Sequence, residues 1–309
     1  MTAGEARAAR AAGEARAAGE ARAAGRREAR TPKGLRNTLV APEPRARFAD
    51  VVAAEWIKLR SLRSSWISYG ATALAVLALN IGTAYDTYAN WSERGAESRA
   101  RYVREGLPLQ VAFTANATLV MMLALGAIGA VALVGEHSTG TIRTTFAAVP
   151  ARGTVLAAKT VVVAAFATVF GAVLAVVSFA VTQAVLGGRG AGMSIGDPAA
   201  ARLVLASALL APLSALAGLA AGALVRRTSA TLVLTVVVLL VLPVALSDGR
   251  HWSAVAGHAT LFQAWSRLTE IAPSRTAFPW TTGGAWTVYA AWGLLAGSLA
   301  VVAGRGRDV

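Results

Sequence analysis

The stretch from Thr160 to Gly188 reads TVVVAAFATVFGAVLAVVSFAVTQAVLGG and contains no charged residue. A helix of about 20 apolar residues crosses a hydrocarbon core of about 30 Å, so this stretch is long enough to span a membrane. Five further stretches share this length and this lack of Asp, Glu, Lys and Arg: Ser64–Tyr85, Gly106–Gly135, Leu203–Val225, Thr228–Ser247 and Thr276–Gly304. The sequence therefore predicts an all-α integral membrane protein with six transmembrane helices.

The composition of the whole chain agrees with this prediction. Hydrophobic residues make up 55% of the 309 residues and charged residues 15%, and the mean hydropathy is +0.53. Soluble domains carry about 25% charged residues, so too few are present to cover a soluble surface of this size. The absence of cysteine excludes disulfides and thiolate metal sites. The net charge of +14 lies mostly in residues 1–63 and in short loops, so nucleic acid is not an expected partner.

Residues 1–44 are a different kind of sequence from the rest. The hexapeptide GEARAA occurs twice in tandem at Gly13–Ala24, and a further copy begins at Gly4. Such low complexity without an apolar stripe predicts a disordered extension, or an over-long start of the reading frame. A basic arm that touches anionic lipid is the other interpretation. No hydrophobic run follows Met1, so a cleaved signal peptide is not expected. We expect a tail at 1–44 and a six-span transmembrane domain at 45–309.

Basic residues near the ends of the spans indicate the orientation, because cytoplasmic loops carry an excess of Lys and Arg. Five of them precede the first span: Arg45, Arg47, Lys58, Arg60 and Arg63. Six spans then place both termini in the cytoplasm, and we expect a multi-pass protein of the bacterial cytoplasmic membrane. The loop Asp86–Glu105 opposes this orientation, since it would face outward with four arginines, although four acids accompany them.

Two polar stretches carry the most information. The first, EWIKLRSLRSSW at Glu55–Trp66, continues a helical pattern of apolar residues from Phe48, which predicts an amphipathic helix at the membrane surface. An ordinary basic flank before the first span is the alternative. The second, GEHSTGTIRTTFAAVPARGTVLAAK, runs from Gly135 to Lys159 and predicts a short helix over 141–149 between Gly140 and Pro150. A plain connecting loop is its alternative.

Both stretches resemble the membrane subunit of type-2 ABC exporters, in particular those of actinobacteria. The resemblance implies an N-terminal interfacial helix with the residues Glu55, Trp56, Lys58, Arg60 and Arg63. It also implies a cytoplasmic coupling helix between spans two and three, in a segment with the residues Glu136, Gly140, Thr141, Ile142, Arg143, Thr145, Pro150 and Arg152. Between spans five and six the family places re-entrant helices, and the charge-free run His251–Ser266 is too short to cross and fits that place.

The resemblance implies a permease subunit of an ABC exporter rather than an enzyme. No GxxxxGK[ST] phosphate loop occurs in the chain, so ATP and magnesium would bind to a separate cytoplasmic ABC ATPase. Further expected partners are membrane lipid and a second permease copy, identical or not. The sequence indicates no catalytic residue, no cofactor on this chain and no metal site; two of its three histidines, His251 and His258, lack a third ligand.

Other functions remain open at this point. An ATP-independent secondary carrier or channel is the alternative, although such carriers generally hold ionisable side chains inside the membrane and the six stretches contain none. A membrane anchor for a soluble partner is the third interpretation. The pairs Gly218–Gly222 and Gly293–Gly297 favour close helix packing within one subunit over a dimer contact. The sequence does not identify a substrate.

Overall fold

A computed structural model describes residues 13, 15–20, 47–149, 151–246, 250–271 and 278–305, without the side chains of Arg143 and Arg305. The chain divides into two units, Met1–Arg45 and Ala46–Val309. In the first unit, residues 15–20 are helical and exposed. Most of the predicted disordered tail lies outside the described residues, so that prediction stays open. The second unit contains all helices discussed below.

Six helical segments of the second unit are long and apolar enough to span a membrane, which confirms the predicted fold class. Three of them are α3, α8 and α9, spanning Arg63–Ala89, Arg152–Gly187 and Pro198–Val225. The second span joins α5 and α6, which are Pro108–Ala112 and Ala115–Ser138. The fifth joins α10 (Thr228–Val236), a π-helical turn (Val237–Val241) and α11 (Leu242–Ala245), and the sixth is α14 (Thr282–Arg305).

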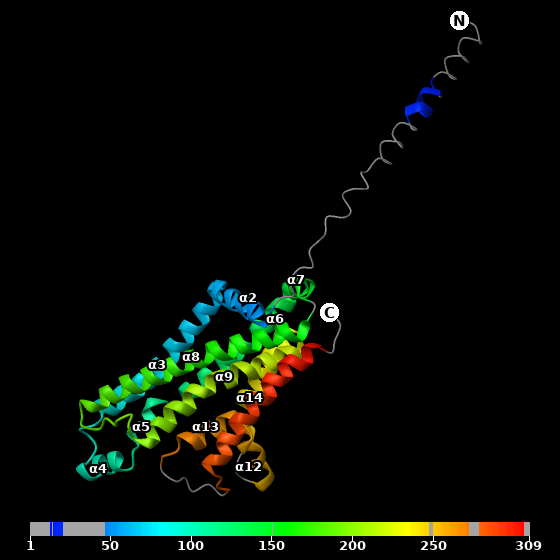
Figure 1. Ribbon diagram of the computed structural model, residues 1–309. Helices are drawn as coiled ribbons and strands as arrows, with labels where there is room; N and C mark the ends of the chain where they lie inside the picture. The colour runs from blue at the N-terminus through cyan, green and yellow to red at the C-terminus, as the bar shows by residue number, and fades with distance from the viewer. Residues whose placement is uncertain are drawn as a thin grey trace, which may run out of the picture. The chain divides into compact units, whose positions relative to one another are not determined.

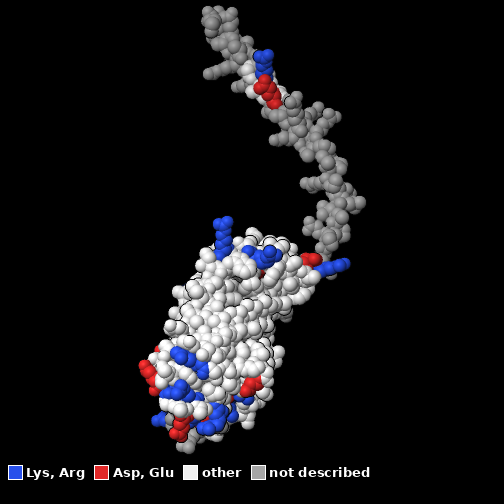
Figure 2. All heavy atoms as spheres, turned by 90° about the vertical axis from the view of Figure 1, so that its left-hand side faces the viewer, with Lys and Arg blue, Asp and Glu red and all other residues white. Residues whose placement is uncertain are grey.

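Five shorter helices lie at the two ends of this bundle (Figure 1). At one end, here called the α7 end, are α2 (Phe48–Ser61) and α7 (Thr141–Ala148). At the other, the α13 end, are α4 (Ala96–Arg104), α12 (His251–His258) and α13 (Leu261–Thr269), with α5 beside them. Figure 2 shows charged side chains gathered toward these two ends with a broad uncharged band between them. This is the charge distribution of a membrane-spanning bundle.

Helix α9 is the centre of the bundle, and most of its residues are buried. It contacts α6, α8 and α14 most extensively. Small residues allow the close approach to α6, since a Cβ atom on Gly218 would lie 1.8 Å from the carbonyl oxygen of Gly126. Gly222 faces Ala130 of α6 as well, so the Gly218–Gly222 pair packs within the subunit. Small residues serve this purpose where helices cannot rely on a hydrophobic driving force.

The second span is broken between α5 and α6. Phe113 is extended there, with φ −149°, and Thr114 caps the N-terminus of α6. Side chains of neighbouring spans bind the freed backbone groups: Asn80 Oδ1 accepts from the Thr114 N–H at 2.9 Å, and the Ser178 hydroxyl donates to Ala112 O at 2.7 Å. Such a break within a span is tolerated only where its polar groups are bonded inside the protein.

The predicted re-entrant run His251–Ser266 forms two helices, α12 and α13, rather than one segment. Arg202 of α9 holds the end of α13, since its guanidinium donates to Leu268 O at 2.8 Å and to Glu270 O at 2.9 Å. The Trp265 indole N–H donates to Ser207 Oγ of α9 at 3.0 Å. These bonds fix α13 on the bundle. Its position relative to a membrane stays a prediction.

Candidate functional site

Helix α2 packs on the start of α8 at the α7 end of the bundle. Val51 is buried against Val155 and Ala158 of α8, and Phe146 of α7 contacts the same group. The Trp66 indole N–H donates to Arg60 O at 3.0 Å, which ties the end of α2 to the start of α3. These contacts fix α2 across the helices that enter the bundle here.

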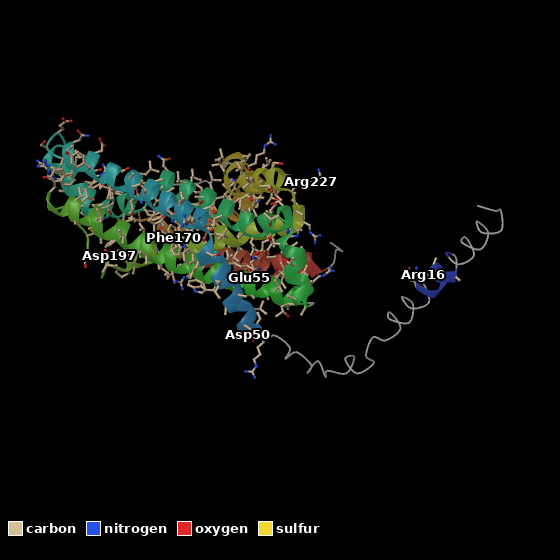
Figure 3. All side chains as sticks on the ribbon, turned by 90° about the horizontal axis from the view of Figure 1, so that it is seen from above. Arg16, Asp50, Glu55, Phe170, Asp197 and Arg227 are labelled. Carbon is tan, nitrogen blue, oxygen red and sulfur yellow. The ribbon has the colours of Figure 1, made fainter. Side chains whose placement is uncertain are left out.

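Four charged side chains meet beneath α2, and we call them the ion cluster: Glu55 and Lys58 of α2, Glu136 of α6 and Lys159 of α8. Lys159 Nζ donates to Glu55 Oε2 at 2.5 Å and to Glu136 Oε1 at 2.9 Å. Lys58 Nζ donates to Glu55 Oε1 at 2.6 Å and to Glu136 Oε1 at 3.3 Å. Figure 3 places Glu55 where α2 meets the bundle, far from Asp197 at the start of α9.

The ion cluster is largely removed from solvent. The side chains of Glu55 and Lys159 are 4% and 7% exposed, whereas that of Lys58 is 31% exposed. Two positive and two negative groups leave the cluster neutral, which lowers the cost of burying it. Removing one partner of a buried ion pair costs about 3–5 kcal/mol, because the other charge stays buried without compensation. The three helices that supply the cluster are therefore held in one arrangement.

Lys58 lies at the solvent side of the ion cluster. Burial by itself would lower the pKa of Lys58, but its hydrogen bond to Glu55 and the charge of Glu136 outweigh that effect and raise the pKa above its ordinary value. Lys58 Nζ also lies 3.4 Å from Thr145 Oγ1 of α7. The ammonium group therefore links α2 to α7 and keeps its proton throughout the physiological pH range.

One acceptor of the ion cluster lacks a donor in the part of the chain that the structure describes. Glu136 Oε2 is buried and makes no hydrogen bond to any residue that the structure describes. A buried polar atom without a partner costs about 1–3 kcal/mol. A shift of α2, α7 or α8 that brought a donor to Glu136 Oε2 would recover this free energy.

Helix α7 begins at a residue that reverses the chain. Gly140 has φ 74° and follows the end of α6, a left-handed position that glycine occupies without steric cost. From there Ile142 is buried against Leu156 and Leu219, in a group of residues from α6, α8, α9 and α14. Phe146 contacts this group and also the group around Val51 of α2. The inner face of α7 is therefore packed on both α2 and the bundle.

The structure brings together much of the expected coupling segment. Glu136, Gly140, Thr141, Ile142 and Thr145 form the end of α6 and the first turns of α7, and the Arg152 guanidinium lies 5.5 Å from the Phe146 ring centre. The side chain of Arg143 and the whole of Pro150 lie outside the described residues. A helix occupies the expected range, and its function as a coupling helix stays a prediction.

A helix, α2, also forms over the expected interfacial segment, and its residues divide into two sets. Glu55 and Lys58 enter the ion cluster, although a helix at the membrane surface is expected to hold its charged side chains in solvent. Arg60 and Arg63 are exposed. Trp56 lies with its ring centre 6.0 Å from that of Phe166 on α8. Fewer basic side chains of α2 are therefore exposed than the sequence indicates, because Glu55 of the same helix and Glu136 of α6 bind Lys58.

The sequence pattern does not single out Lys159, which is the most buried base of the cluster. The charge-free stretch begins at Thr160, so Lys159 is expected in a loop, but α8 starts at Arg152 and carries Lys159 inside the span. Arg202 lies inside α9 for the same reason. Glu136, the lone acid that ends the charge-free run 106–135, is the one local signal of a base buried nearby.

The comparison with protein families gives one match. The family described as ABC-2 family transporter protein matches residues 51–246, which is more than half of the chain. The matched region includes α7, the whole ion cluster and five of the six spans. No curated protein matches the chain.

Proposed function

This chain belongs to the ABC-2 transporter family, and from that premise we propose that it is the permease subunit of an ABC exporter coupled to ATP hydrolysis on a separate subunit. Membership of the family makes the chain a membrane transport subunit that is not itself catalytic. Beyond family membership, we propose that transport runs out of the cell and that it is coupled to ATP hydrolysis.

The observation that carries the proposal is the ion cluster between α2, α6 and α8. A permease driven from outside needs a surface element that moves as a unit with the ends of its spans. Helix α7 meets this need, since Ile142 anchors it to the bundle and Lys58 and Phe146 connect it to α2. A push on α7 would reach the spans through these side chains rather than through flexible loop backbone.

The outer face of α7 is available to a partner. Thr141, Thr144, Ala147 and Ala148 are exposed along one side of this helix. We propose that a cytoplasmic ABC ATPase docks here and on the exposed part of α2. Closure of the ATPase on ATP and magnesium would press α7 against α2, with the Glu136 acceptor gaining a donor in the displaced state.

The rest of the complex follows from the same proposal. ATP and magnesium bind to the partner subunit and not to this chain. A second permease copy, identical or not, completes the transport path, because the six helices of one subunit are few for enclosing a path across the membrane. The complex resides in the bacterial cytoplasmic membrane with α2, α7 and both termini in the cytoplasm.

Two measurements test the proposal. A tagged chain is purified from its native membranes in mild detergent, and an ATPase recovered in equimolar amount supports it. The recovered complex is then compared with an Arg143→Glu variant, which we expect to lose substrate-stimulated ATP hydrolysis while it still inserts. Arg227→Glu, in the loop between α9 and α10, is the matched control. A chain that purifies alone and moves solute without ATP would instead be a carrier.

A further inference from the structure

A cavity of about 460 Å³ lies at the α13 end of the bundle, opposite the ion cluster. Its volume falls within the range of about 300–1,000 Å³ that is usual for small-molecule sites. Its walls come from the break between α5 and α6, from α9, and from α13 with the segment that precedes α14. The residues used below are Gln110, Thr114, Gln263, Ser266, Arg267 and Trp280.

The walls of this cavity are fixed by bonds within the protein. Asn80 Oδ1 accepts from both the N–H and the hydroxyl of Thr114, at 2.9 and 3.0 Å. Arg202 holds the last carbonyls of α13. The Trp280 ring stacks on His258 with 4.4 Å between ring centres and 7° between planes. The cavity is therefore formed before any ligand enters.

Hydrogen-bonding groups on the walls are left unused. The side chains of Gln110, Gln263 and Ser266 make no hydrogen bond to the described part of the chain, and those of Gln110 and Ser266 are exposed. Each amide offers both a donor and an acceptor. A ligand that occupied the cavity would therefore meet several unpaired donors and acceptors that are mostly uncharged.

The ion pair in the cavity walls disfavours the binding of a charged ligand. Arg267 forms an ion pair with Glu270, and both line the cavity. An anion near Arg267 would also lie near the Glu270 carboxylate, and a cation near Glu270 would lie near the guanidinium. An uncharged group with several donors and acceptors meets neither penalty. The indole of Trp280 adds an apolar surface beside the amides.

We propose that this cavity binds a glycosyl group, whose ring carries hydroxyls around its edge and C–H bonds on its faces. The hydroxyls would pair with the side chains of Gln110, Gln263 and Ser266, and the C–H face would rest on Trp280. The group could arrive as the headgroup of a glycolipid or as a free sugar. This inference goes beyond the proposed function, and it holds or fails without reference to the ATPase.

The test uses the full-length chain in a polyoxyethylene detergent, because sugar-based detergents would compete. Monoglucosyl diacylglycerol, phosphatidylglycerol and phosphatidylcholine with matched acyl chains are added in equal amounts, and bound lipid is measured by native mass spectrometry. We expect the glucosyl lipid to be retained about 25-fold more than either phospholipid, because two additional hydrogen bonds contribute about fivefold each. Equal retention, or a preference for phosphatidylglycerol, overturns the proposal.

Two single-residue variants test whether the lipid binds in this cavity. Gln263→Leu should reduce the selective retention about fivefold, as the loss of one hydrogen bond does. Asn90→Leu changes an exposed amide at the same end of the bundle, outside the cavity walls, and should leave retention unchanged. Size-exclusion profiles and unfolding temperatures show that both variants fold. Selective retention that Gln263→Leu does not alter would overturn the assignment to this cavity.

A last experiment distinguishes a glycolipid headgroup from a free sugar as the source of the glycosyl group. Methyl glucoside in excess should displace the glucosyl lipid if the ring alone is recognised. Selective retention without displacement assigns the site to a glycolipid, whose acyl chains then contribute. Either result supports the glycosyl site and decides how the group reaches it.

Discussion

Lys159 of α8 donates to Glu55 of α2 across a distance of 2.5 Å, although 104 positions separate the two residues in the chain. The contact joins a helix outside the spans to the interior of a spanning helix. Glu136 of α6 accepts from the same ammonium group at 2.9 Å. The Lys159 nitrogen of α8 therefore links α2 and α6. The position of α2 is therefore determined by charge inside the bundle as well as by its apolar face.

Replacing Lys159 by Met should destabilise the protein by about 3–5 kcal/mol, because the Glu55 and Glu136 carboxylates stay buried with one cation fewer. Thermal unfolding of the purified chain in nanodiscs measures the effect. Arg60→Met removes an exposed basic side chain from the same region and should change stability little. Combining Lys159→Met with Glu55→Gln should restore part of the loss, since the double variant removes an opposite pair. A Lys159→Met protein as stable as the Arg60 control would contradict the role given to the ion cluster.

The contact between Lys58 and α7 should be insensitive to pH over the physiological range. A lysine whose pKa is raised in the folded state contributes stability that is complete below its ordinary value of 10.5 and is lost only as the pH rises through the higher, folded value. The chain has no cysteine, so spin labels at Phe48→Cys and Ala148→Cys report the α2–α7 distance without background. We expect one narrow distance distribution from pH 6 to pH 9.

A Lys58→His variant should bring the titration into that range. Histidine has an ordinary pKa of about 6.5, so the cation would be lost on going from pH 6 to pH 9 and the distance distribution should broaden. Broadening in the unchanged protein over the same interval would show that Lys58 does not hold α7.

Six spans and two surface helices were predictable from the sequence because their signals are local. Each span contains a long run without charge, and Gly140 and Pro150 bracket α7 in the chain. The buried cluster was not predictable in the same way. Whether Lys159 enters a loop or a span depends on where α8 begins, and that depends on acids from two other helices.

The break in the second span has the same origin. Gly106–Gly135 forms a continuous run without charge, and no residue in it requires a helix to stop at Phe113. The bonds that stabilise the break come from Asn80 and Ser178 on other spans. A tertiary contact, rather than local propensity, therefore decides the backbone at this position, and Asn80 carries no sign of it in the sequence.

Asn80→Leu should destabilise the bundle by about 1–3 kcal/mol, because the Thr114 N–H and the Ser178 hydroxyl lose a buried partner. Hydrogen exchange should rise at Thr114 and its neighbours in α6. Asn116→Leu alters an exposed asparagine on the same α6 helix and should have little effect on either measurement. Unchanged exchange in Asn80→Leu would mean that the break persists without this side chain.

Gly218→Ala should weaken the contact between α6 and α9. The added methyl group would lie 1.8 Å from Gly126 O, a backbone atom that cannot turn aside, so the helices must separate. Overpacking of this kind costs about 1–3 kcal/mol. Gly70→Ala on α3 is the matched control, since no atom lies within 4 Å of its added Cβ, and it should be neutral or stabilising. The difference between the two unfolding temperatures measures the effect, and equal values would disprove the tight packing.

The proposed orientation predicts opposite reactivity at the two ends of the bundle. Cysteine introduced at Thr144, on the exposed face of α7, should react with a membrane-impermeant maleimide only after cells are opened. Cysteine at Ser98, in α4 at the α13 end, should react in intact cells. The unmodified chain contains no cysteine and supplies a blank. The α4 region is the stringent case, because its four arginines argue against an outward position. The reverse labelling pattern would place α7 outside, away from any cytoplasmic ATPase, and would remove the coupling proposal with it.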